Sequence, residues 1–140
     1  MSHEIYQATI VAHDRAPKHE GPLPGATHAA TIDNPLCGDI VTMRLVVEGD
    51  VVRAAAFEAR GCALARAGAS ILATLAATMT PEQLRALATR FDQFIRESPD
   101  APIPPDLGEL AAFAGVRKVR SRRQCATLAF HALLAALGPG

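Results

Sequence analysis

Residues 40–58 read IVTMRLVVEGDVVRAAAFE and contain the clearest secondary-structure signal in the chain. Two runs rich in β-branched and aliphatic residues, 40–47 and 51–58, flank the compact turn sequence EGD at 48–50. Runs of this kind on either side of a short turn predict an antiparallel β-hairpin.

Side-chain alternation predicts how this hairpin is buried. In the first strand Met43, Leu45 and Val47 share one face, and the polar residues Thr42 and Arg44 share the other. We therefore expect one buried face and one solvent-exposed face. The second strand alternates less regularly, because Arg53 has the same parity as Phe57. This break in the alternation indicates a β-bulge.

Before the hairpin the sequence predicts three segments. A short helix is expected over residues 3–13, a turn-rich stretch with three prolines over 14–25, and a strand over 27–32. The apolar side of the helix consists of Ile5, Ile10 and Val11.

After the hairpin, apolar residues recur at helical spacing in two stretches. The first helix starts at Cys62, and its inward side is expected to be Leu64, Ala67, Ile71, Leu72, Leu75 and Met79. The second starts with TPEQ at 80–83, which combines a threonine N-cap, a first-turn proline and a capping-box glutamine. Its apolar face comprises Leu84, Leu87, Ala88, Phe91, Phe94 and Ile95.

The last part of the chain predicts a proline-rich loop over 98–106 and two further helices. Asp106 is expected to cap a short helix through Phe113, which Gly115 ends. The final helix spans 123–137, with Leu128, Ala129, Ala132, Leu133 and Leu137 inward. The order of elements predicts one α+β domain over residues 1–140, a small antiparallel sheet of about three strands with helices packed on it.

Composition narrows the classes of function. The chain has 14 basic and 14 acidic residues, so it has no global signal for a nucleic-acid or membrane partner. Its N-terminus lacks the basic and apolar regions of a signal peptide, and no apolar run is long enough to span a bilayer. We therefore expect a cytoplasmic protein.

The three cysteines each lie where one predicted element meets the next. Cys37 lies in a turn before the hairpin, and Asp39, two residues later, can offer a carboxylate to the same metal ion. Cys62 and Cys125 start helices, where backbone N–H groups favour the thiolate that binds metals and attacks sulfur. Their wide spacing matches no zinc finger, so spacing alone also leaves open buried structural cysteines.

Four segments in order resemble the signature segments of the IscU/SufU/NifU N-terminal family. They are residues 13–21 (HDRAPKHEG), 34–39 (NPLCGD), 57–63 (FEARGCA) followed by AS at 69–70, and 122–129 (RRQCATLA). Gln124 replaces the histidine that precedes the third cysteine in IscU-type proteins, and the chaperone motif LPPVK is absent before Cys125. These features, with the long proline-containing interval between Cys62 and Cys125, resemble the SufU branch.

The resemblance implies a SufE/IscU-like fold and one metal site made by Cys37, Asp39, Cys62 and Cys125. It implies zinc as the cofactor, or alternatively a [2Fe-2S] cluster, with Cys37 as sulfur acceptor and Arg122 beside the metal. The implied function is a zinc-dependent sulfurtransferase that receives persulfide sulfur from a SufS-like cysteine desulfurase and passes it to a downstream SUF-type iron–sulfur assembly complex.

The sequence leaves alternatives to this function open. A non-enzymatic [2Fe-2S] scaffold would use the same ligands, and a structural metal domain would be an interaction module. We expect a monomer or a weak dimer.

Other polar residues carry weaker predictions. The basic run comprises Arg117, Lys118, Arg120, Arg122 and Arg123. It has no interleaved aromatic residues that would favour nucleic acid, and the alternatives are a solvated surface or, as we favour, a docking surface for an acidic partner. The histidines match no ligand position of the family: His13 and His19 are expected to be structural or partner-facing, and His131 to be partly buried.

Overall fold

The computed structural model describes residues 7–77 and 79–139 and has the expected α+β architecture. Its elements in chain order are α1 (Ala8–Arg15), β1 (His28–Asn34), β2 (Asp39–Glu48), β3 (Val51–Arg60), α2 (Ala63–Ala76), α3 (Pro81–Arg96), the 3₁₀ segments η2 (Pro105–Lys118) and η3 (Arg120–Arg122), and α4 (Arg123–Leu137).

The three strands form one antiparallel sheet in the order β1-β2-β3, which confirms the predicted hairpin. Val46 is opposite Ala54 but Val47 is opposite Val52, so Arg53 is the extra residue of a β-bulge. This bulge explains the irregular alternation of β3, because it shifts the parity of the residues on either side.

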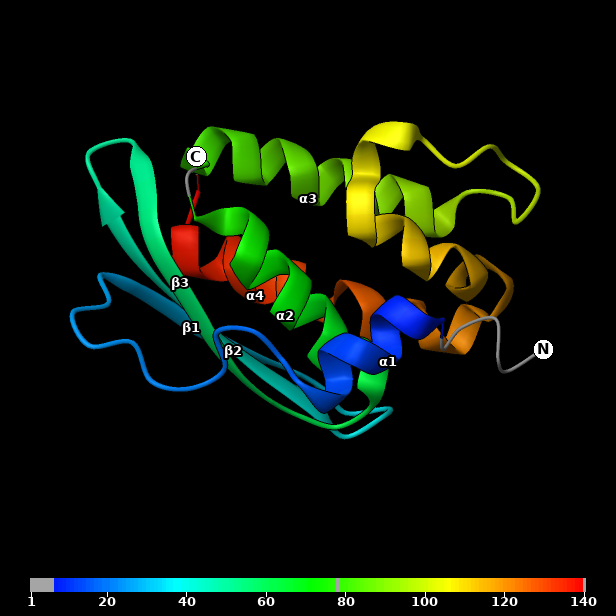
Figure 1. Ribbon diagram of the computed structural model, residues 1–140, viewed down its shortest axis with the longest axis horizontal. Helices are drawn as coiled ribbons and strands as arrows, with labels where there is room; N and C mark the ends of the chain where they lie inside the picture. The colour runs from blue at the N-terminus through cyan, green and yellow to red at the C-terminus, as the bar shows by residue number, and fades with distance from the viewer. Residues whose placement is uncertain (1–6, 78, 140) are drawn as a thin grey trace.

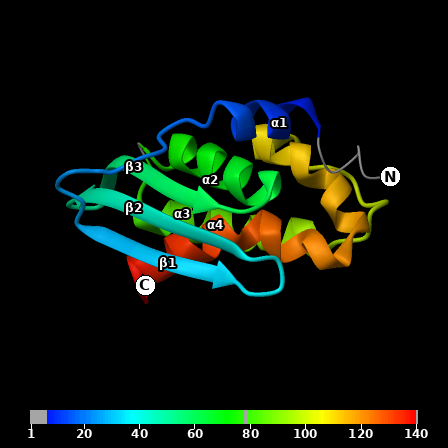
Figure 2. The same cartoon turned by 90° about the horizontal axis from the view of Figure 1, so that it is seen from below.

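The helices cover one face of this sheet in layers (Figures 1 and 2). α2 and α4 pack directly on the strands, and α3 packs on α4 from the far side. Between α3, η2 and α4 the ring of Phe91 stacks on Phe130 at 4.7 Å between centroids and meets Phe113 edge-on at 5.6 Å. Burial of large aromatic rings makes this second layer part of the core.

The first helix differs in its limits from the prediction. α1 runs to Arg15, two residues beyond the expected end, with Ile10 buried and Val11 half-buried. Ile5, expected on its apolar side, lies outside the described residues. β1 is likewise longer than expected, because its pairing with β2 continues to Asn34 opposite Asp39.

The start of α3 has the predicted capping box, with the side chains of Thr80 and Gln83 each accepting a backbone N–H of the other at 3.0 Å. The preceding helix is shorter than predicted, because α2 ends at Ala76 and Met79 lies beyond it. The inward placement of Leu75 was wrong, since this residue is 37% exposed.

The predictions for Asp106 and Gly115 were also wrong. Asp106 does not cap a helix; its Oδ1 accepts from Arg90 Nη2 at 2.6 Å. Gly115 is buried inside η2, which continues to Lys118, and the backbone kink falls instead at Gly108 with φ 58°. α4 has the predicted limits. Among the described residues, no helix has the length and apolarity required to cross a bilayer.

Candidate functional site

Cys37 is presented by the short loop that joins β1 to β2. Asn34 and Asp39 pair at the base of this loop, and Asn34 O accepts the N–H groups of Cys37 at 3.1 Å and Gly38 at 2.8 Å. Gly38 has φ 72°, a left-handed conformation that favours glycine. The result is a turn that leaves Cys37 exposed, next to Leu36, which is 85% exposed.

Asp39, the first residue of β2, lies fully buried beside the start of α2. Its Oδ1 accepts the backbone N–H of Cys62 at 2.9 Å, and its Oδ2 lies 3.5 Å from Cys62 Sγ. A buried carboxyl needs such a donor, because removal from water without a hydrogen bond is costly. Asp39 therefore connects the hairpin to the second cysteine.

Gly61 makes this approach of Asp39 feasible. It has φ 126°, and a Cβ atom at this position would overlap Asp39 Oδ1. Gly61 was not among the predicted site residues, although a glycine directly before a candidate ligand is a detectable signal of close packing.

Cys125, the third residue of α4, completes the cluster from the opposite end of the chain. It is buried, and its Sγ lies 3.3 Å from Cys37 Sγ. One donor atom each from Cys37, Asp39 and Cys125 lies within 4.8 Å of the others, and Cys62 contacts the same carboxyl group. The structure thus brings together all four residues that the sequence singled out.

The pKa values of Cys62 and Cys125 are shifted in opposite directions. Hydrogen bonding from Cys125 lowers the pKa of Cys62 from its ordinary 9.0 to about 7, against the effect of burial, and the N–H groups of Ala65 and Leu64 assist. The pKa of Cys125 is raised, chiefly because its S–H donates to Cys62 and secondarily because it is buried. Cys62 is therefore the first of this pair to become a thiolate.

The donor set fits a thiolate-binding metal ion. Donor atoms around one ion with metal–sulfur distances of about 2.3 Å lie no more than about 4.6 Å apart, close to the spread found for Cys37, Asp39 and Cys125. Soft sulfur donors favour zinc or iron–sulfur clusters over magnesium or calcium. Among the described residues, no histidine belongs to this group.

Arg122 and Gln124 flank Cys125 at the start of α4. Arg122 is the half-buried N-cap residue, and its backbone N–H donates to Val119 O at 2.9 Å. Gln124, where IscU-type proteins have a histidine, is exposed. The role of Arg122 beside a metal stays a prediction.

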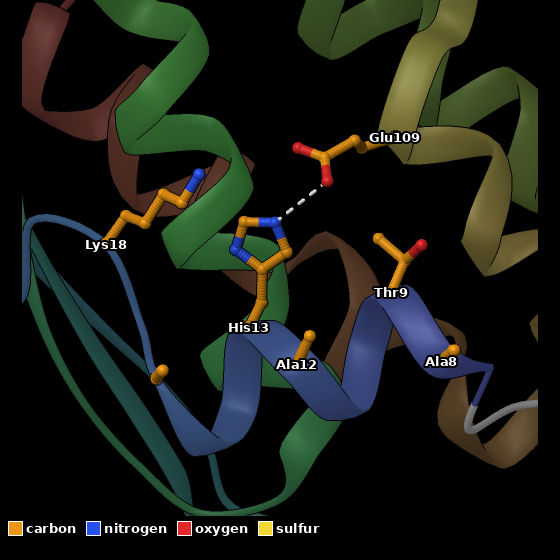
Figure 3. Close-up of a pocket in the computed structure, with 7 residues that line it drawn as sticks. Ala8, Thr9, Ala12, His13, Lys18 and Glu109 are labelled. Carbon is orange, nitrogen blue, oxygen red and sulfur yellow. Dashed lines mark hydrogen bonds and ion pairs between the residues drawn. The ribbon is translucent and has the colours of Figure 1, made fainter.

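His13 is part of a different cluster, and Figure 3 shows its contact with Glu109. It is buried beside a hollow of about 440 Å³, with Nδ1 2.6 Å from Ser70 Oγ and Nε2 3.2 Å from Glu109 Oε2. The backbone N–H of Lys18 also donates to Ser70 Oγ at 2.8 Å. His13 therefore connects α1 to α2 and η2, which is a structural role.

Arg66 of α2 holds the N-terminal segment beside the sheet, a role that was not predicted from the sequence. Its guanidinium donates to Asp14 at 3.1 Å, to Glu20 at 3.0 Å and to Ala59 O at 2.9 Å. The carboxylates, Glu20 foremost, raise the pKa of Arg66. An arginine within an otherwise apolar helix was the available signal.

The basic run does not form one solvated surface. Arg117 is 4% exposed, stacks over Phe94 at 4.8 Å, and donates to the carbonyl groups of Pro99, Ala101 and Ala114. The prediction of a docking surface was therefore wrong for Arg117, because its guanidinium is used to close the proline-rich loop. His131, expected to be partly buried, is exposed on α4.

Comparison with known proteins identifies the family. The family described as NifU-like N terminal domain matches residues 5–126. The iron–sulfur cluster assembly scaffold protein IscU of Streptococcus pyogenes serotype M1 is 32% identical over 133 residues, covering 95% of this chain and 82% of that protein. The zinc-dependent sulfurtransferase SufU of Bacillus subtilis (strain 168) is 31% identical over 130 residues, covering 92% and 86%.

A solved structure gives the same result at the level of the fold. The N-terminal part of a nitrogen-fixing NifU-like protein from Brucella abortus has a TM-score of 0.86 to this structure and 27% sequence identity, covering 96% of this chain and 92% of the other. The chain belongs to the NifU-like N-terminal domain family, which includes IscU and SufU proteins.

Proposed function

We propose that this chain is a zinc-dependent sulfurtransferase of iron–sulfur cluster assembly, with Cys37 as the sulfur acceptor. The supporting observation is the contrast in exposure within the cluster: Cys37 is exposed, whereas Asp39 and Cys125 are buried. Of the candidate ligands, Cys37 is thus the most accessible to a sulfur atom that arrives on another protein. The similarity to a protein named as a zinc-dependent sulfurtransferase supports the same assignment.

The proposed step is a thiol–persulfide exchange with a SufS-like cysteine desulfurase. The Cys37 thiolate attacks the terminal sulfur of the persulfide on the desulfurase cysteine, and a new S–S bond forms on Cys37. The S–S bond of the donor breaks, and its cysteine leaves as a thiolate. Sulfur changes its carrier with no net oxidation, so the step needs no further oxidant or reductant.

The other residues would prepare Cys37 for this step. Cys37, Asp39, Cys62 and Cys125 would hold zinc, which stabilises bound thiols in their deprotonated form. Asp39, an oxygen donor in a sulfur set and hydrogen-bonded to the Cys62 N–H, would anchor the site to the sheet. We assign Arg122 the role of compensating the negative charge of three thiolates and one carboxylate.

Radiolabelled cysteine tests the acceptor. Wild-type protein incubated with a cysteine desulfurase and labelled cysteine should acquire label that a reducing agent removes. Cys37→Ser should acquire none, because it lacks the attacking thiolate. Cys62→Ser is the matched control, since it also removes one candidate ligand and should retain some label on Cys37. Equal labelling of Cys37→Ser and wild type would refute the assignment.

A second candidate function is a scaffold that assembles and transfers a [2Fe-2S] cluster on the same residues. It is supported by the mixed sulfur and carboxylate ligand set and by the similarity to proteins named as scaffolds. Anaerobic reconstitution with iron and sulfide should then give a visible absorption band that lasts longer in Asp39→Ala. A colourless protein that retains bound zinc would exclude this candidate in favour of the first.

A further inference from the structure

A hollow of about 280 Å³ at the seam between α3 and α4 has a strongly basic lining. Three arginines from three elements line it: Arg96 from the last turn of α3, Arg120 from η3, and Arg123 from the start of α4. Among its lining residues only Asp92 is acidic. With His131 neutral, the lining carries three positive charges against one negative charge.

Arg123 is fixed in place by the protein. Its Nη2 donates to Arg117 O at 2.7 Å, and Arg117 is itself buried. Its Nε is buried and has no hydrogen-bond partner in the described part of the chain, so a ligand in the hollow meets the terminal nitrogens of this guanidinium. A planar guanidinium that is already oriented suits bidentate binding of a carboxylate.

The beginning of α4 adds to the positive potential of this hollow. The helix continues from η3, so the N–H of Arg123 donates to Arg120 O, but no side-chain hydrogen bond caps the helix and its first turn contains no acidic residue. The N-terminal end of a helix carries partial positive charge, which favours anions nearby. Three guanidinium groups and a helix start therefore act in the same direction.

The hollow continues as a groove along the two helices. A second hollow of about 320 Å³ shares Asp92, Arg96, Thr127 and His131 with the first. It extends towards Leu134 and is lined further by Ala88, Thr89, Gln93 and Phe130. Because the arginines are confined to one end, the groove fits an extended ligand with an anionic end better than an isolated ion.

We propose that this α3–α4 groove binds an acidic segment of a protein partner. Asp or Glu carboxylates of the partner lie at Arg96, Arg120 and Arg123, and the rest of the segment follows α3 and α4. Asp92 competes for the same position, because its Oδ2 lies 3.0 Å from Arg96 Nη2 and its Oδ1 lies 4.0 Å from His131 Nε2. The groove contains none of the four candidate metal ligands, and Gln124, which lines its basic end, is the neighbour of Cys125 in the chain.

NMR titration of the full, isotopically labelled chain tests the proposal. The probe is a synthetic peptide with a glutamate run at one end and leucine and alanine at the other. The expected result is amide shift changes in the second half of α3 and the first turns of α4. Raising the salt concentration from about 0.1 M to about 1 M should reduce binding, because exposed charges are then screened.

Charge variants make the test specific. The double variant R96Q/R120Q should weaken peptide binding about tenfold, since each arginine contacts a carboxylate. R15Q/R53Q changes the net charge equally outside the groove and should leave affinity unchanged. D92N should bind the peptide more tightly than wild type, a gain that damage to the fold would not produce.

Four results would overturn the proposal. They are equal binding of a peptide with glutamine in place of glutamate, displacement of the glutamate peptide by equimolar inorganic phosphate, tighter binding of an RNA oligonucleotide in the groove, and shift changes confined to other surfaces. The second result would indicate a site for small anions, and the third a nucleic-acid surface.

Discussion

Replacing Gly61 with alanine tests whether close packing of Asp39 organises the site. Gly61 has φ +126° and the added Cβ would overlap Asp39 Oδ1, whereas Gly21 has φ +132° and no atom within 4 Å of such a Cβ. The two positions therefore have nearly the same φ, in a range that side chains rarely adopt, and differ in the contact with Asp39. G21A is the matched control for G61A.

The expected difference follows from the bond that Asp39 must give up. Backbone strain at either position costs about 1–3 kcal/mol of the free energy of unfolding. In G61A the carboxyl must also leave the Cys62 N–H, 2.9 Å away. Loss of a buried hydrogen bond to a charged group costs about 1.5–3 kcal/mol, so G61A should be less stable than G21A by about 2 kcal/mol.

Urea unfolding of metal-free protein, followed by circular dichroism, measures this difference. G61A should also bind zinc more weakly than G21A, because Asp39 no longer lies beside the three cysteines. Equal unfolding free energies and equal zinc affinities in the two variants would refute the inference that Gly61 makes room for Asp39.

Two further predictions concern buried polar groups. C125A should raise the pKa of Cys62 from about 7 towards 9.0, because the S–H donor that stabilises its thiolate is lost. The ultraviolet absorbance of the thiolate, followed against pH in metal-free protein, measures this pKa. An unchanged titration curve would contradict the prediction. R117M should lower the free energy of unfolding by about 3 kcal/mol or more, because three carbonyl groups lose their donor. Thermal unfolding measures the loss, with the exposed R15M as control, and a loss no larger than in R15M would count against the proposed role of Arg117.

Features that depend on neighbouring residues were predictable from the sequence. The hairpin turn at 48–50, the bulge at Arg53 and the capping box of Thr80 and Gln83 are each determined by a few adjacent residues. The helix end predicted at Gly115 was wrong because it depends on distant residues. Tertiary packing buries Gly115 inside η2 and overrides its local preference for a helix end.

The candidate site likewise combines features that adjacent residues determine with contacts between distant parts of the chain. Local signals placed each cysteine at the start of a helix or in a turn, but only the family resemblance indicated that Cys37 and Cys125 meet, since their contact joins distant parts of the chain. Arg117 could not be interpreted from its basic neighbours, because its acceptors on Pro99 and Ala101 come from a loop whose path is set by packing.

The anchored hairpin loop also determines how far a sulfur atom could travel on this protein. Cys37 is two residues from Asp39, which is fixed in the sheet and hydrogen-bonded to the Cys62 N–H. At about 3.5 Å per extended residue, the Cα of Cys37 can move no further than about 7 Å from that of Asp39. Any movement of Cys37 is therefore confined to the surroundings of this loop, and under the proposed function both the donor and the recipient of sulfur must bring their reactive groups there in turn.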